Sequence, residues 1–283
     1  MIYLSSSCFK QRNLKKNLEA CLDYQSKNIE LSGNLFYEKN FINILLDYKR
    51  KYSMNFLLHN YSPPPKKKFV INLSSLNDKI YEKSINHCVN SIKLSKILKA
   101  KKYSVHTGFF LDPIAKDLGK KLQKTDLNKV KSSIKRFCKS IILLNNEAKK
   151  NNISIYFENN VISNENYKTF NKIIPFLFVN KNDFDLYLKR LYIPPLLDIG
   201  HLKVSCKTLR CNFLENLLYL SSFTDYFHIS DNNGKNDENR SIRKNTNFLK
   251  YLKMINLKNS TITLEISEEY NLLKSKEIIS NLI

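Results

Sequence analysis

Short apolar runs of strand length alternate with longer stretches of helical period along almost the whole chain. The strand-like runs lie at residues 2–5, 29–31, 55–59, 103–106, 153–158, 196–199, 226–229 and 262–265. Such alternation is typical of strand–helix–strand units that build a parallel sheet. The pattern therefore predicts an α/β fold in which helices fill the gaps between eight strands.

Two of the intervening stretches have especially clear helical signals. Over residues 76–100, apolar side chains such as Ile85 and Ile92 recur at roughly helical spacing. A second helix is predicted to follow Thr125, because Thr125 and Asp126 offer side-chain oxygens that can cap a helix N-terminus.

The number of repeats favours a closed barrel over an open, doubly wound sheet. No GxGxxG motif follows the first strand, as would be expected in a dinucleotide-binding open sheet. The chain shows neither an internal repeat nor a linker. We therefore expect residues 1–283 to form one (β/α)8 TIM barrel domain, a fold that typically takes about 250 residues.

Composition excludes several classes of protein. No run of about 18 apolar residues is present to span a bilayer, and the N-terminal apolar stretch has no basic leader, so a soluble cytoplasmic protein without a membrane partner is expected. The six cysteines are scattered without a CxxC pair. Reduced thiols are therefore expected, rather than a zinc knuckle or a disulfide framework.

The formal charge of +22 would suit an anionic partner such as nucleic acid. However, the lysines are spread along every segment, beside many Asn and Ile residues. Most of them are expected to be solvated on helix faces. Charge alone therefore does not predict a nucleic-acid partner.

Residues capable of metal or acid–base chemistry recur at one end of successive predicted strands. They are His59, His106, Glu158, Asp198, His228 and Glu265. In (β/α)8 barrels this end of the strands forms the active face. Glu158 and Glu265 end strongly apolar runs, where a carboxylate is costly unless it is paired with a cation. A bound metal would supply that cation.

Two further segments carry polar groups beyond strand ends. Asp198 and His201 form a DxxH sequence, in which Gly200 is expected to make room for a turn. The predicted strand at 226–229 leads into a polar loop that contains Asp237 and Asn239.

In the order and spacing of these segments, the chain resembles the xylose isomerase-like barrel superfamily, which includes sugar phosphate isomerases and epimerases and the endonuclease IV group. The matching segments are Ile29-Glu30-Leu31-Ser32-Gly33, His59-Asn60-Tyr61, Val105-His106-Thr107-Gly108, Phe157-Glu158-Asn159, Asp198 to His201, His228-Ile229-Ser230-Asp231 and Leu264-Glu265. They span almost the whole chain.

This resemblance implies a ligand set for a divalent metal, which would be Mn, Mg, Co or Zn. The ligands would be Glu158, Asp198, His228 and Glu265. His201 would be a substrate contact or a ligand of a second metal. In an isomerase, His59 and His106 would contact the substrate or support the metal ligands from behind. Tyr61 would pack against the sugar ring or be an ordinary buried tyrosine.

The endonuclease branch implies additional zinc ions. His59 and His106 would join Glu158 around one zinc, and His201 and Asp237 would hold another with a histidine at position 239. That position is Asn239 here, and an amide oxygen is a much poorer zinc ligand than imidazole. The sequence also has no evident DNA-binding loop with interleaved aromatic residues.

We therefore expect a metal-dependent sugar or sugar-phosphate isomerase or epimerase. A metal on adjacent sugar oxygens would acidify a C–H bond, and Glu158 and Glu265 would transfer the proton, unless both are ligands only. The alternative is a zinc-dependent phosphodiesterase acting on abasic DNA, and only that alternative gives the chain a nucleic-acid partner. A barrel that binds a ligand without turnover, and a homo-oligomer, both stay open.

Overall fold

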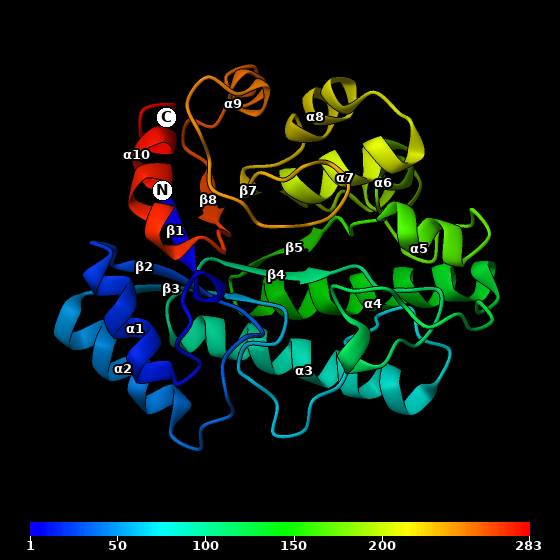
Figure 1. Ribbon diagram of the computed structural model, residues 1–283. Helices are drawn as coiled ribbons and strands as arrows, with labels where there is room; N and C mark the ends of the chain where they lie inside the picture. The colour runs from blue at the N-terminus through cyan, green and yellow to red at the C-terminus, as the bar shows by residue number, and fades with distance from the viewer.

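Eight parallel strands close into a barrel with β1 to β8 in chain order, as the computed structural model of residues 1–283 shows (Figure 1). The strands are β1 (Ile2–Ser5), β2 (Asn28–Leu31), β3 (Asn55–His59), β4 (Lys102–His106), β5 (Ser154–Glu158), β6 (Pro195–Asp198), β7 (Tyr226–Ile229) and β8 (Thr261–Leu264). Closure is made by β1 and β8, where Ile2 pairs with Ile262 and Leu4 with Leu264. The predicted (β/α)8 fold is confirmed.

Helices surround the barrel and connect its strands (Figure 1). They are α1 (Leu14–Asp23), α2 (Phe41–Tyr52), α3 (Asp78–Ile97), α4 (Val130–Lys150), α5 (Asn164–Thr169), α6 (Lys181–Tyr187), α7 (Ile199–Leu209), α8 (Phe213–Ser221), α9 (Asn247–Leu252) and α10 (Leu272–Ser280). Four short 3-10 helices are η1 (Ser6–Cys8), η2 (Ala115–Asp117), η3 (Lys189–Leu191) and η4 (Glu269–Asn271). None of the helices is long and apolar enough to cross a membrane.

One predicted helix start is wrong. The helix α4 begins at Val130, and its N-cap residue Lys129 makes no side-chain capping bond. Thr125 and Asp126 lie in an irregular segment before it. This segment is held by tertiary contacts, because the backbone N–H of Asn128 donates to the carbonyl of Phe110 at 2.6 Å and Leu127 packs against the core. Those contacts override the local capping signal.

The barrel interior changes from apolar to polar along the strands. Side chains two residues apart in a strand point to the same face. In five strands, one member of such a pair belongs to a small apolar cluster and the other is a buried polar residue nearer the carboxyl end: Tyr3 and Ser5, Leu57 and His59, Tyr156 and Glu158, Leu196 and Asp198, and Tyr226 and His228. The apolar layer therefore plugs one end of the barrel and supports a polar cluster at the other.

Loops after β3, β4 and β5 form a separate apolar wall beside the barrel mouth. Its eight buried residues are Val70, Phe109, Leu111, Leu122, Ile162, Phe170, Phe176 and Val179. An isolated antiparallel bridge joins Phe109 to Phe176 within this wall.

Candidate active site

The polar cluster at the barrel mouth brings together the four residues expected to bind a metal. One side-chain ligand atom each from Glu158, Asp198, His228 and Glu265 lies within 4.8 Å of all the others. Glu158, Asp198 and His228 end or lie within β5, β6 and β7, and Glu265 directly follows β8. The pairing of β5 with β6, β6 with β7 and β7 with β8 brings these distant parts of the sequence together.

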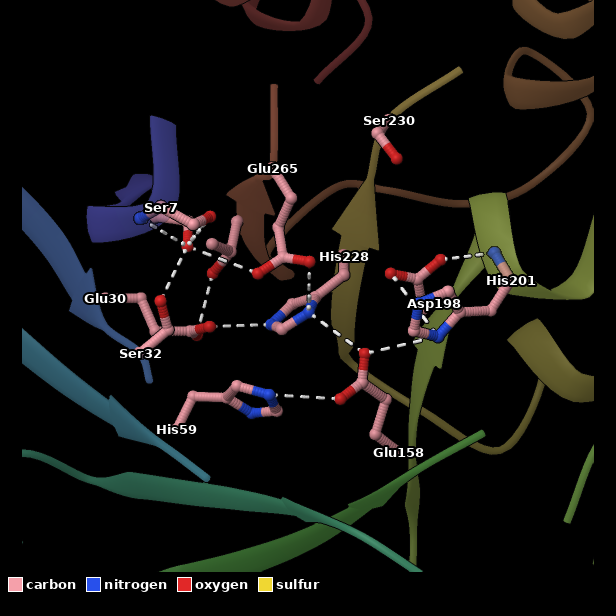
Figure 2. A network of polar contacts seen from close by, with 12 residues as sticks. Ser7, Glu30, Ser32, His59, Glu158, Asp198, His201, His228, Ser230 and Glu265 are labelled. Atoms are coloured by element: carbon pink, nitrogen blue, oxygen red, sulfur yellow. Dashed lines mark hydrogen bonds and ion pairs between the residues drawn. The ribbon is translucent and has the colours of Figure 1, made fainter. Parts of the chain in front are cut away.

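His228 lies at the centre of this cluster (Figure 2). Its Nδ1 is 3.3 Å from Oε1 of Glu158 and 3.6 Å from Oε2 of Glu265. Nδ1 of His228, Oε2 of Glu158 and Oδ2 of Asp198 are buried, and none of them has a hydrogen-bond partner in the protein. Such orphaned groups are rare and cost free energy unless a ligand or ion satisfies them. The donor set therefore fits a divalent cation.

The charges of the cluster support the same conclusion. Burial raises the pKa of Asp198 to about 7, and the carboxylate of Glu158 adds to that rise. Burial alone lowers the pKa of His228, but Glu30, Glu265 and Glu158 outweigh it and raise that pKa well above its ordinary value. The carboxylates of the cluster thus place negative charge at one buried point, and only histidines lie close enough to offset it. A bound divalent cation would neutralise it directly.

Glu158 also connects this cluster to two more histidines. Its Oε2 lies 3.1 Å from Nε2 of His59 and 3.3 Å from Nε2 of His106. Together these three residues form a second group with metal-binding geometry. His59 is almost fully buried and is held from behind by Ser104, whose Oγ is 3.0 Å from Nδ1 of the ring.

His201 lies in the first turn of α7, not in the expected loop turn. The reason is that Asp198 caps α7, since its Oδ1 accepts a hydrogen bond from the backbone N–H of His201 at 2.6 Å. The ring of His201 faces acceptors on both sides, with Nδ1 2.9 Å from the carbonyl of Asn159 and Nε2 3.2 Å from Oδ2 of Asp237. Burial lowers the pKa of His201, but Asp198 and Asp237 raise it well above its usual range.

Gly200 is required for close packing and not for a turn. A Cβ at this position would lie 2.8 Å from Oγ of Ser230 and 3.3 Å from Oδ1 of Asp198. Ser230 is itself committed, because its Oγ donates to Oδ1 of Asn239 at 3.0 Å. The small residue thus lets α7 approach the loop after β7.

We expect Gly200→Ala to destabilise the protein by about 1–3 kcal/mol, because the added methyl overpacks a buried contact. Thermal or denaturant unfolding would measure this loss. Combining it with Ser230→Ala removes the atom that the methyl meets, and the double variant should recover part of the stability. Purely additive losses would show that the strain lies elsewhere.

Tyr61 both supports the loop after β3 and lines the cavity. Its hydroxyl accepts a hydrogen bond from the backbone N–H of Ile71 at 2.9 Å, and its ring packs against Gly33, where a Cβ would lie 2.9 Å from the ring edge. Burial raises the pKa of Tyr61. Its hydroxyl is thus engaged with the loop after β3, while the side chain still lines the cavity described next.

A cavity of about 480 Å³ opens beside the metal-ligand cluster. Its lining includes His106, His201, Asp237 and Asn239 on one side and Phe109 and Phe176 from the apolar wall. A mixed lining of apolar surface and a few converging polar groups is typical of small-molecule sites.

One residue of the polar cluster, Glu30, was not among the site residues predicted from the sequence. Glu30 on β2 is fully buried, and its Oε1 lies 2.7 Å from Nε2 of His228. Its sequence signal is a lone carboxylate within the apolar strand Ile29-Glu30-Leu31. The rule that buried carboxylates need partners, which was applied to Glu158 and Glu265, would have selected Glu30 as well.

Comparisons with known proteins find similarity in structure only. No family model matches the chain, and neither does any curated protein sequence. Among solved structures, a D-tagatose 3-epimerase-like protein has a TM-score of 0.75 and 19% identity over 99% of this chain and 96% of its own. An L-ribulose 3-epimerase has a TM-score of 0.65 and 13% identity, covering 98% of this chain and 86% of that one. A 3-keto-D-glucoside 4-epimerase from E. coli has a TM-score of 0.68 and 11% identity, covering 99% and 98%. The chain therefore shares the (β/α)8 barrel fold of these solved structures.

Proposed function

We propose that this protein is a divalent-metal-dependent sugar epimerase or isomerase. The observation that carries the proposal is the pairing of Glu158 and Glu265 across one point of the barrel mouth. In Figure 2 Glu265 approaches the His228 ring from above and Glu158 from below. Two carboxylates on different sides of a bound sugar suit removal of a proton from one face and its return to the other. The similar solved structures, a 3-epimerase-like protein, a 3-epimerase and a 4-epimerase, support the same class of reaction.

The two glutamates are held in place by neighbouring side chains. Glu158 is positioned by His59 and His106, and Oε1 of Glu265 accepts a hydrogen bond from the hydroxyl of Ser5 at 3.2 Å. Burial raises the pKa of Glu265, but His228 opposes it and lowers that pKa to about 2. The ionised form, which is the one that can accept a proton, is therefore favoured.

A metal held by Glu158, Asp198, His228 and Glu265 would polarise adjacent sugar oxygens and make the neighbouring C–H bond more acidic. Three carboxylates and one imidazole are an oxygen-rich donor set, which favours Mn²⁺ or Mg²⁺ over zinc. The glutamates would then serve both as ligands and as proton carriers.

We further propose that His106, His201 and Tyr61 contact the sugar, because all three line the cavity. His59 is only 4% exposed and is better suited to holding Glu158 than to touching a substrate. Lys120 and Lys121 also line this cavity, and their ammonium groups could receive a phosphate. The proposal therefore covers free sugars and sugar phosphates.

Hydrogen exchange with solvent tests the reaction class. In deuterated water, the manganese-loaded protein should incorporate deuterium at one carbon of a ketose such as tagatose, psicose or ribulose, detected by NMR or mass spectrometry. A proton transfer at carbon leaves this trace, whereas phosphodiester hydrolysis has no such step. Absence of exchange into any sugar of a broad panel would refute the proposal.

A zinc-dependent phosphodiesterase is the second candidate, favoured by the additional group of His59, His106 and Glu158. Against it, Asn239 replaces the imidazole of a third zinc site, and its side-chain oxygen already accepts from Ser230. An abasic DNA duplex incubated with zinc-loaded protein provides the direct comparison. Strand cleavage without sugar exchange would make this the function.

A further inference from the structure

We propose that Glu30 is a positioning residue, which fixes the His228 ring so that Nδ1 is the atom presented to the metal. The inference rests on the proposed metal site but does not depend on which reaction the site performs. Glu30 would then contact the metal ligand His228 from the side opposite the metal, without binding the metal itself.

The Glu30 carboxylate contacts one of the expected metal ligands, His228, and two side chains outside that set. Oε1 lies 2.7 Å from Nε2 of His228, and Oε2 accepts hydrogen bonds from the hydroxyl of Tyr226 and, at 2.9 Å, from that of Thr263. No lysine or arginine lies within ion-pair distance of it. His228 is therefore the group at ion-pair distance that can offset the charge of this fully buried carboxylate.

The neighbouring strands clamp Glu30 in this position. Tyr226 and His228 are two residues apart on β7 and point to the same face, so one strand engages both oxygens of the carboxylate. Thr263 adds a donor from β8, the next strand. Glu30, His59 and His228 also lie close enough to be considered as a metal group, but Oε2 of Glu30 is occupied by the hydroxyls of Tyr226 and Thr263.

The orientation determines which ring nitrogen carries the proton. Nε2 of His228 faces Oε1 of Glu30 at ion-pair distance. Nδ1 lies on the opposite side of the ring, toward Glu158 and Glu265 (Figure 2). A metal bound at Nδ1 would leave the ring proton on Nε2, where the carboxylate can accept it. A carboxylate behind a metal-binding histidine typically fixes the tautomer and makes the ring a better ligand.

Glu30→Gln should weaken Mn²⁺ binding by about 10–100-fold, the usual effect of losing such a partner. The free Mn²⁺ concentration, measured by electron paramagnetic resonance during titration, gives the dissociation constant without any activity assay. Glu19→Gln is the matched control, because Glu19 also accepts from a tyrosine hydroxyl, that of Tyr48, but lies away from the site. Glu30→Asp keeps the charge on a shorter side chain and should fall between the wild type and Glu30→Gln.

A second measurement separates positioning from general loss of structure. In protein labelled with ¹⁵N-histidine and loaded with ¹¹³Cd²⁺, the metal coupling of His228 should appear on Nδ1, with Nε2 protonated. Coupling through Nε2 would overturn the inference. So would a Glu30→Gln variant that binds Mn²⁺ as tightly as the wild type, or a wild-type protein that binds no divalent metal. Weakened binding in Glu30→Gln, combined with a wild-type protein that exchanges no sugar hydrogen, would instead support Glu30 and refute only the proposed function.

Discussion

Glu265→Gln is expected to lower the rate of epimerisation by about 10²–10⁴-fold, the contribution of a positioned acid–base group. Glutamine keeps the size of the side chain and one oxygen that can still bind the metal, but it cannot accept a proton at neutral pH. Glu158 remains in place, so the variant should still exchange the hydrogen of one epimer with solvent. It should not exchange the hydrogen of the other.

Glu158→Gln should give the opposite result, with exchange only in the epimer whose C–H bond faces Glu265. This complementary loss distinguishes two proton carriers from two residues that are ligands only. Metal content must be measured in both variants, and Glu147→Gln on the outer helix α4 is a suitable control. If both variants lose exchange of both epimers while keeping the metal, the two-base mechanism is wrong.

The fold was predictable because hydrophobic burial leaves a regular trace in the sequence. Parallel strands enclosed by helices are apolar on both faces, so each of the eight strands appears as a short apolar run between longer amphipathic stretches. Strand ends were accurate to about one residue, as with Ile199, which begins α7 instead of ending β6. The start of α4 was not predictable, because Thr125 and Asp126 form a good local cap and only contacts from Phe110 and Leu127 exclude it.

The positions of the site residues were more predictable than their partners. Chemically capable residues at strand ends meet in any (β/α)8 barrel, so proximity of Glu158, Asp198, His228 and Glu265 follows from the fold. The partners of each side chain depend on how the strands are placed around the closed barrel. Glu30 lies mid-strand on β2, and only closure of the barrel brings it behind His228 on β7.

The buried cluster of carboxylates and His228 predicts that both activity and folding stability depend on a bound metal. Chelation should abolish epimerase activity, because proton transfer needs an acidified C–H bond, and it should also lower the unfolding temperature. A metal present at 100 times its dissociation constant adds about 2.7 kcal/mol to folding stability. For a domain of this size that corresponds to a shift of about 5 °C or more in the unfolding temperature.

Asp198→Asn is the sharpest variant for this test, because Asp198 has two separable roles. Its Oδ1 caps α7 by accepting the backbone N–H of His201, and asparagine caps helices nearly as well as aspartate. Its Oδ2 is buried without a partner and is directed to the metal cluster, where a neutral amide is a poor substitute. The variant should therefore fold with its helix intact and lose most of the metal-dependent rise in unfolding temperature, measured by differential scanning calorimetry with and without Mn²⁺. A full metal-induced rise in Asp198→Asn, or full activity after exhaustive chelation, would contradict the role of this cluster as the metal site.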